Sequence, residues 1–183
     1  AHELCTPLAT LIANNELALR RPEQADMREV LASNLEELHR LTGIVNDMLF
    51  LSQADRGVGA RRVPVSSLAS VTVDVLDYHE AALAEAGLTA KMVGDAHGAF
   101  DVPLLRRALS NLLGNATRYA RNGSIIQVNF RTVDQDRVLI SVTNCGGSIA
   151  PEVLPHLFDR FFRGDPARSH GQSNHGLGLA IVG

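Results

Sequence analysis

The feature that most constrains the fold is a long run of apolar residues with helical spacing in the first third of the chain. Its members are Val30, Leu31, Leu35, Leu38, Leu41, Ile44, Val45, Met48, Leu49 and Leu51. This spacing places them on one face of a helix of about six turns. A helix with so wide an apolar face is stable only when that face packs against another element.

A shorter run with the same spacing comes before it and supplies one partner. Its apolar members are Leu4, Leu8, Leu11, Ile12, Leu17 and Leu19. Pro22 and its charged neighbours interrupt the pattern, so we predict two helices joined by a short loop at residues 22–26. One such hairpin has a small core. Its apolar stripe is covered either by the rest of the chain or, most economically, by a second copy in a four-helix bundle.

The start of the first helix permits two interpretations. Thr6 can cap a helix that begins at Pro7, because threonine favours the cap and proline the first helical position. Alternatively, the helix extends back through His2, which then lies one turn from Thr6 on the same face with Glu3 beside it. Taken alone, the segment favours the cap at Thr6.

The rest of the chain alternates between strand and helix patterns. We predict strands at residues 62–65, 88–93, 98–100, 124–132 and 138–142, and helices at residues 66–86 and 101–120. Asp101 is a suitable N-cap and Gly87 a suitable helix end. Residues 176–183 resemble the beginning of another helix. The predicted fold class is α+β, with residues 1–55 as a helical domain, 56–62 as a linker and 63–183 as an α/β domain.

The composition excludes several classes of protein. A formal net charge of −3 lacks the basic footprint of a nucleic-acid-binding domain. No run of about 18 apolar residues occurs, so we predict that this segment makes no membrane contact. Cys5 and Cys145 are too few for a disulfide framework and fit a reducing compartment. The seven histidines show no metal-ligand spacing.

A polar stripe breaks the usual preferences of the helix predicted at residues 101–120. Asn111, Asn115 and Tyr119 are each four residues apart, with Arg118 beside them. Two asparagines and one glycine inside a helix cost about 2 kcal/mol relative to alanine, and such violations often mark a site. An amide oxygen is a ligand that Mg²⁺ accepts, and an arginine can bind a phosphate. The alternative is that both amides only face solvent or cap neighbouring loops.

Two glycine-rich segments follow the last predicted strand. They contain Asn144, Gly146 and Ile149, and then Gly176 and Gly178. Glycines before a helix allow backbone N–H groups to approach a phosphate closely. Each pattern alone is also common in ordinary turns. The polar segment at residues 164–175 has the composition of a lid.

Taken in order, these patterns resemble those of bacterial sensor histidine kinases over almost the whole chain. The motifs are His2-Glu3-x-x-Thr6-Pro7-Leu8 (H box), Asn111-Leu112-Leu113-x-Asn115-Ala116 (N box), Asn144-x-Gly146-x-x-Ile149 (first glycine box), Phe158-x-x-Phe161-Phe162 (F box) and Gly176-Leu177-Gly178-Leu179 (second glycine box). Five motifs in the family's order are very unlikely to arise by chance. The resemblance therefore favours the helix that extends back through His2.

The resemblance implies both the architecture and the activity. Residues 1–55 would be the dimerisation and phosphotransfer domain, and residues 63–183 a Bergerat-type α/β sandwich that binds ATP and is incomplete at its C-terminus. The homodimer would autophosphorylate a histidine from ATP with Mg²⁺ and pass the phosphoryl group to an aspartate of a response regulator receiver domain. The segment would be cytoplasmic, in a protein anchored in the bacterial inner membrane.

The resemblance also implies roles for individual residues. His2 would accept the phosphoryl group, Glu3 would act as a base or orient the imidazole, and Thr6 would position water for dephosphorylation of the partner. Asn115 would bind Mg²⁺ with support from Asn111. The nucleotide-binding positions would be Asn111, Asn115, Arg118, Tyr119, Asn144, Gly146, Ile149, Gly176, Leu177 and Gly178.

A few positions depart from the family's pattern. Asn144 stands in place of the adenine-binding aspartate, although its amide oxygen can still accept from the adenine amino group. Ser148 replaces a glycine and Cys5 an arginine. Asn144 and the residues after it resemble the heavy-metal sensor subgroup. The alternatives are a catalytically silent or phosphatase-only dimeric scaffold with residual ATP binding, and an ATPase of the gyrase, DNA-repair or chaperone type, which lacks the helical hairpin.

Overall fold

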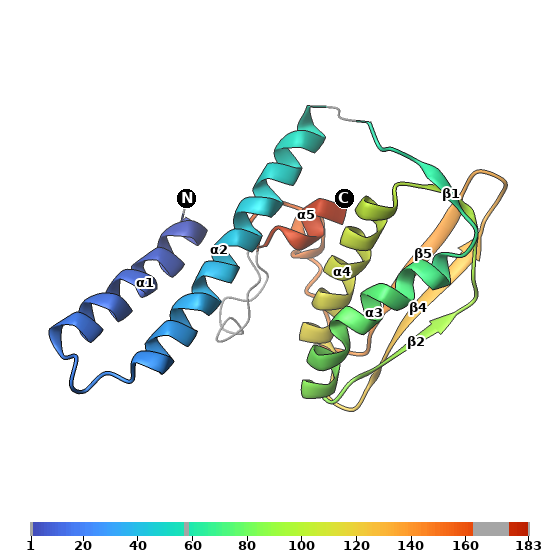
Figure 1. Cartoon of the computed structure of the whole chain (residues 1–183). Coiled ribbons are helices and arrows are strands. Elements are labelled where there is room, and N and C mark those ends of the chain that lie inside the picture. The colour runs from blue at the N-terminus through green and yellow to red at the C-terminus, as the bar shows by residue number, and fades with distance from the viewer. Residues whose placement is uncertain (1, 57–58, 163–175, 183) are drawn as a thin grey trace.

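A helical hairpin stands beside an α/β part in the computed structural model of this chain (Figure 1). The structure describes residues 2–56, 59–162 and 176–182, apart from the side chains of His2 and Glu3. The hairpin consists of α1 (His2–Arg20) and α2 (Met27–Asp55). Both helices and the loop between them agree with the sequence prediction.

The first helix begins at His2 and continues through Pro7. The helix that carries the H box is thereby confirmed, and a start capped by Thr6 is wrong. The second helix has a well-formed N-cap, because Asp26 Oδ1 accepts from the backbone N–H groups of Arg28 at 2.9 Å and Glu29 at 3.3 Å. This cap fixes the point at which the loop ends and α2 begins.

The α/β part contains two small sheets and the helices that cover them. Its elements are β1 (Val63–Val65), α3 (Leu68–Glu85), β2 (Thr89–Val93), β3 (Gly98–Phe100), α4 (Val102–Tyr119), β4 (Ile125–Thr132), β5 (Val138–Thr143), the 3-10 helix η1 (Leu154–His156) and α5 (Gly178–Val182). Strand β4 is central in a mixed sheet, parallel to β2 and antiparallel to β5. Strands β1 and β3 form a separate antiparallel pair. The predicted α+β class is confirmed.

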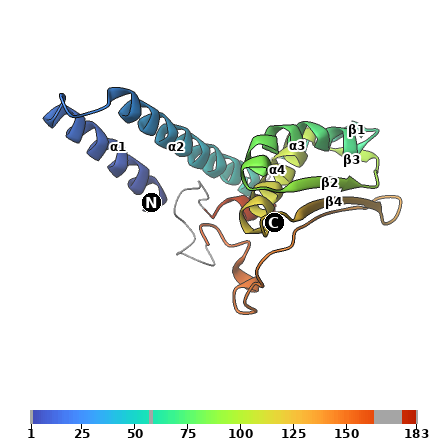
Figure 2. The same cartoon turned by 90° about the horizontal axis from the view of Figure 1, so that it is seen from below.

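Helices α3 and α4 lie on the same side of β2 and β4, as Figure 2 shows. The core between these layers includes Leu68 and Val75 of α3, Leu109 of α4, and Ile126 and Val128 of β4. The alternating burial of β4 is the period of a strand with one face against helices.

One detail of the predicted core of α4 is corrected. The spacing of Leu105, Leu109, Leu112 and Ala116 predicts that these residues form the buried face of α4, but Leu113 is fully buried and Leu112 only half-buried. Leu109 and Ala116 are buried as predicted, and Leu113 is buried with them because α4 packs against both α3 and the sheet.

Helix α5 lies between α2 and α4 (Figure 1), and it contacts both of them. An apolar cluster of Ile44 and Leu51 from α2 and Leu177 just before α5 is buried at this junction. The C-terminal motif of the chain is therefore held against the long helix of the hairpin.

None of the helices within the described residues is long and apolar enough to cross a bilayer.

Candidate functional site

The polar stripe predicted in the sequence lies on the second half of α4. Asn111, Asn115 and Arg118 are half-buried there, and Tyr119 at the end of the helix is 37% exposed. The start of the helix is fixed by Asp101, whose Oδ1 accepts from Leu104 N at 3.2 Å. This cap and the buried leucines of α4 set the rotation of the helix, and thereby the direction in which the stripe faces.

Gly178 of the second glycine box lies directly against the N box. A Cβ atom on Gly178 would stand 3.2 Å from Asn111 Oδ1, so only a glycine allows α5 to approach this closely without displacing the amide. The Nδ2 atom of Asn111 is buried and has no hydrogen-bond partner within the described residues. A buried amide donor without a partner costs free energy, so this group favours a ligand that supplies an acceptor oxygen.

The first glycine box is tied to the end of α4. Arg121 N donates to Cys145 O at 2.7 Å, and Ala120 and Gly146 form a β-bridge. A Cβ atom on Gly146 would overlap the carbonyl oxygen of Tyr119, so this position requires glycine. The tie places the half-buried side chain of Asn144, which follows β5, next to the C-terminal end of the polar stripe. Ile149 lies farther along and is 52% exposed.

The F box and the second glycine box meet through their backbones. Phe161 N donates to Gly176 O at 2.8 Å. Both residues have positive φ, 65° for Phe161 and 66° for Gly176, and a Cβ on Gly176 would come within 2.6 Å of the Phe161 carbonyl carbon. The backbone contact thus holds the end of the F box against the start of the second glycine box. The predicted lid at residues 164–175 falls outside the described residues.

Leu177 has a role that its place in the motif did not reveal. Its side chain is 1% exposed and packs with Ile44 and Leu51 of α2, with Phe50 and Ile181 around them. The structure therefore places it in the apolar junction with the hairpin. The glycines on either side of it, rather than Leu177 itself, face the N box and the F box.

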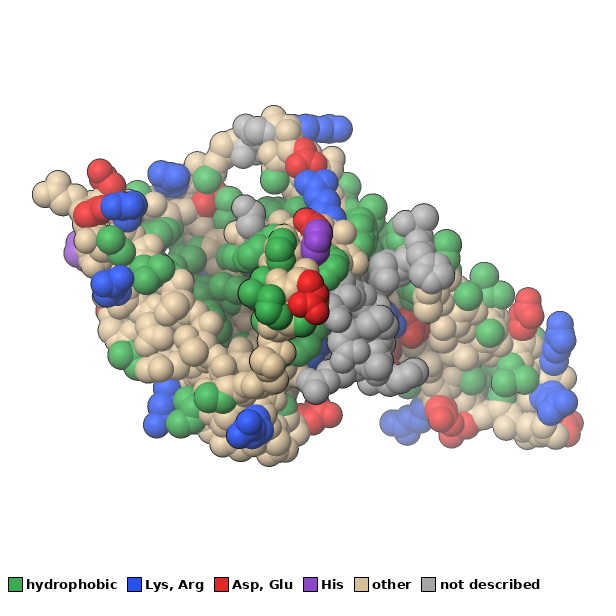
Figure 3. Space-filling model, turned by 180° about the vertical axis from the view of Figure 1, so that it is seen from behind, with side chains coloured by type: hydrophobic (Ala, Val, Ile, Leu, Met, Phe, Trp, Pro, Cys, Tyr) green, Lys and Arg blue, Asp and Glu red, His purple; other side chains and the backbone are tan. Residues whose placement is uncertain are grey.

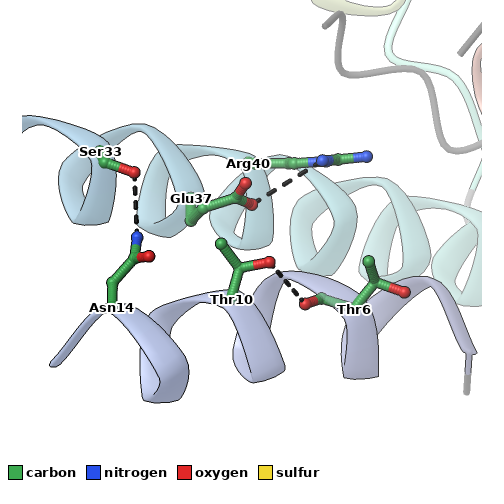
Figure 4. Close-up of polar contacts among 6 residues, drawn as sticks. All are labelled: Thr6, Thr10, Asn14, Ser33, Glu37 and Arg40. Carbon is green, nitrogen blue, oxygen red and sulfur yellow. Dashed lines mark hydrogen bonds and ion pairs between the residues drawn. The ribbon is translucent and has the colours of Figure 1, made fainter. Parts of the chain in front are cut away.

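The H box lies on the first turns of α1. The backbone of His2 and Glu3 is helical, and their side chains fall outside the described residues. Thr6 is exposed, and its carbonyl oxygen accepts from Thr10 Oγ1 at 3.2 Å, as Figure 4 shows. The helix therefore places the backbones of His2 and Thr6 one turn apart. In Figure 1 α2 and α5 lie between α1 and α4, and Leu4 in the H box packs against the buried cluster of Ile44, Leu51 and Leu177.

Sequence reasoning missed an arginine that joins the two parts of the chain. Arg107 Nη2 on α4 donates to Asp47 Oδ1 at 2.6 Å and to Asn46 O at 3.0 Å, and its guanidinium lies 4.1 Å from the centroid of the Phe50 ring. These partners are about sixty residues away along the chain and belong to no local motif. The sequence carried no signal for this contact.

A second long-range ion pair also involves a motif residue. Arg160 of the F box donates to Asp55 Oδ1 at 2.7 Å, at the last residue of α2. The hydrogen bond from Arg160 holds the pKa of the Asp55 carboxyl below its ordinary value. The pair is exposed, so it contributes little stability by itself. It does show that the F box, like Leu177, touches the long helix of the hairpin.

The donor set of the site can be tested against Mg²⁺ and ATP. No group of three or more His, Cys, Asp and Glu side chains that could hold a metal ion occurs among residues 2–56, 59–162 and 176–182. A metal ion at the stripe would thus rely on amide oxygens such as that of Asn115 and on oxygens of a bound phosphate chain. The unpartnered donor of Asn111 fits such an anionic ligand. The residues present are compatible with a magnesium–nucleotide complex.

Two family models match the chain. The model described as "His Kinase A (phospho-acceptor) domain" matches residues 1–57. The model described as "Histidine kinase-, DNA gyrase B-, and HSP90-like ATPase" matches residues 100–183. The first covers the hairpin with the H box, and the second covers the N, F and glycine boxes.

Similar proteins agree with these matches. The sensor histidine kinase CusS of Escherichia coli K12 is 46% identical over all of this chain, which covers 38% of CusS. The sensor protein IrlS of Burkholderia pseudomallei is 37% identical over all of this chain, which covers 39% of IrlS. The chain thus spans about two fifths of the length of these relatives.

Solved structures show the same fold. The histidine kinase AdeS of Acinetobacter baumannii superposes with a TM-score of 0.82 at 24% identity, over 100% of this chain and 84% of that one. Full-length ShkA, solved in complex with AMPPNP, gives a TM-score of 0.68 at 26% identity, over 87% of this chain and 33% of that one. With the two family models and the relatives, the chain belongs to the sensor histidine kinase family, as its motifs predicted.

Proposed function

We propose that this chain is a kinase core that binds ATP with Mg²⁺, phosphorylates His2 and passes the phosphoryl group to an aspartate of a response regulator receiver domain. The observation that carries the proposal is the buried, unpartnered Nδ2 of Asn111 next to Gly178. A donor held in this way is satisfied by a phosphate oxygen of a bound nucleotide. The match to an ATPase family and the AMPPNP bound by ShkA support the same ligand.

The nucleotide would lie along the polar stripe of α4. Asn115 would hold Mg²⁺ through its amide oxygen, with Asn111 in support, and Arg118 and Tyr119 would contact the phosphates and the nucleoside. Asn144, with Gly146 and Ile149, would receive the adenine. Gly176 and Gly178 would let the backbone of the lid approach the phosphates, with Leu177 anchoring that backbone to α2.

The chemistry of transfer depends mainly on positioning. A neutral imidazole is a competent nucleophile at neutral pH, so His2 would form a nitrogen–phosphorus bond while the bond from the γ-phosphorus to the ADP oxygen breaks. Glu3 would accept the proton of the imidazole or orient the ring, and Thr6 would position the water molecule that hydrolyses the phosphoaspartate of the regulator and releases phosphate. Bound Mg²⁺ neutralises the charge of the phosphates during transfer.

The active assembly would be a homodimer formed through the hairpin. Large apolar side chains remain exposed along both of its helices, including Leu8, Ile12, Leu31, Leu38, Val45 and Leu49. Figure 3 shows hydrophobic side chains at the surface of this part of the molecule. A second copy would cover them in a four-helix bundle. The receiver domain of the response regulator would be the second protein partner.

We further propose that residues 1–55 and 63–183 act as separate units joined by the linker at 56–62. Such a linker would let the ATPase unit move between the docked arrangement seen here and one that reaches His2. The chain would be the cytoplasmic part of a protein of the bacterial inner membrane. The share of CusS and IrlS that this chain leaves uncovered supports a longer parent protein.

Nucleotide binding tests the site without requiring turnover. Calorimetric titration of the chain with AMPPNP and Mg²⁺ should show one site. Asn115→Ala should raise Kd by about tenfold or more, because a ligand of the metal and a polar contact are lost. Asn46→Ala is the matched control, since its side chain is exposed and its backbone carbonyl, which accepts from Arg107, is kept. Equal affinities of the Asn115→Ala and Asn46→Ala variants would contradict the assignment.

A further inference from the structure

Both α1 and α2 carry heptad stripes of mostly exposed apolar residues, and each stripe is interrupted by one asparagine. On α1 the stripe is Leu8, Ile12, Asn15 and Leu19, and on α2 it is Met27, Leu31, Asn34, Leu38, Leu41 and Val45. Intervals of four and three residues alternate along both. This is the seam of a coiled coil, in which one residue of every three or four packs against a partner helix.

The two asparagines lie at the same level of the hairpin and are paired. Asn34 Nδ2 donates to Asn15 Oδ1 at 3.0 Å, and Asn15 Nδ2 donates to Leu11 O at 2.7 Å. The side chain of Asn34 is only 8% exposed, yet its Oδ1 is buried without a hydrogen-bond partner among the described residues. One acceptor of this pair therefore lacks a hydrogen bond, on stripes whose apolar side chains are mostly exposed.

A neighbouring pair shows the contrast. Asn14 Nδ2 donates to Ser33 Oγ at 3.1 Å, and Figure 4 shows the two side chains pointing toward each other across the hairpin. Both are half-buried and belong to the seam between α1 and α2 within one copy. The pair Asn15–Asn34 also joins α1 to α2 within one copy, but each of its residues lies one position farther along its helix, on the heptad stripe.

We infer that Asn15 and Asn34 of two copies form a buried polar layer that fixes the register of the dimer. An amide both donates and accepts, so it is complementary to the same group of a second copy. A buried asparagine in an apolar seam selects one register and one oligomeric state, because every other alignment leaves an amide against leucine. The inference rests on the homodimer of the proposed function and adds the residues that determine its alignment.

The test uses the full 183-residue chain with spin labels on a single cysteine of each copy. Glu36→Cys, on the exposed side of α2, carries the label in a background with Cys5→Ser and Cys145→Ser. Pulsed dipolar spectroscopy gives the distance distribution between copies, and sedimentation gives the mass. The test variant is Asn15→Leu with Asn34→Leu. The matched control is Asn14→Leu with Ser33→Ala, which also removes an inter-helix hydrogen bond but outside the heptad stripes.

The wild-type chain and the control should be dimers with one narrow distance maximum. The Asn15→Leu/Asn34→Leu variant should melt at a higher temperature, yet gain further distance maxima or species larger than a dimer. A single narrow maximum and a pure dimer in that variant would overturn the inference while leaving the homodimer intact. A lower melting temperature would also overturn it, because the layer would then act through stability. A monomeric wild-type chain would overturn the homodimer itself.

Discussion

Arg107 of α4 and Asp47 of α2 form an ion pair of 2.6 Å that joins the ATPase fold to the phospho-acceptor hairpin. The buried cluster around Leu177 and the exposed pair Arg160–Asp55 join the same two parts. Three contacts of different kinds therefore hold the ATPase part against α2, and Leu4 of α1 packs against the same buried cluster. The arrangement is a docked one, in which the second glycine box lies against the hairpin.

Removing the carboxylate of Asp47 should loosen this docked arrangement. Asp47→Ala leaves Arg107 without its ion-pair partner, and a half-buried pair of this kind contributes about 1 kcal/mol. Small-angle scattering should show a larger radius of gyration. The control is Asp74→Ala, which deprives the adjacent Arg106 of its partner inside the ATPase part. Equal scattering from both variants would show that the Asp47 pair does not hold the two parts together.

His79 should make the stability of the ATPase part depend on pH. Burial lowers the pKa of His79, whose Nε2 lies 2.8 Å from Ser110 Oγ. The unfolded chain therefore binds a proton at a pH where the folded chain does not, and stability is lost as pH falls below about 6.5. Urea denaturation between neutral and mildly acidic pH should show a steeper loss in the wild type than in His79→Gln. His97→Gln, at an exposed position, should keep the wild-type slope. The assignment to His79 would be contradicted if His97→Gln flattened the slope and His79→Gln did not.

Gly146 should be intolerant of any side chain. Gly146→Ala places a methyl group against the Tyr119 carbonyl, and relieving that overlap should cost roughly 1–3 kcal/mol. Thermal denaturation should show the loss, and nucleotide affinity should fall because the first glycine box no longer closes on α4. Gly147→Ala is the neighbouring control, since nothing lies within 4 Å of its added Cβ. Matching melting temperatures for the two variants would refute the requirement.

Much of this architecture could be predicted from local patterns. The Asp101 cap, the alternation in β4 and β5, and the positive φ of Gly87 at the end of α3 each follow from residue type and spacing alone. The order of the motifs predicted the family. The helix through His2 was an exception, because Pro7 and Thr6 locally favour a later start. The motifs decided that question where propensity alone pointed the other way.

Contacts between distant segments could not be predicted in the same way. Nothing near Arg107 in the sequence distinguishes it from Arg106, yet one binds α2 and the other α3. The burial of Leu177 depends on where α2 lies. The burial of Leu113 rather than Leu112 depends on how α4 packs against α3 and the sheet. Such choices are made by packing between elements. The spacing of apolar residues along a single helix or strand does not determine these contacts.

Transfer of the γ-phosphoryl group of labelled ATP to the chain tests the central claim most directly. The chain is incubated with γ-labelled ATP and Mg²⁺ as wild type, as His2→Gln, and as His39→Gln, which changes an exposed histidine on α2. The account predicts an acid-labile, alkali-stable label in the wild type and in His39→Gln, and none in His2→Gln. Label that persists in His2→Gln, or a wild-type chain that binds ATP but takes up no label, would contradict it.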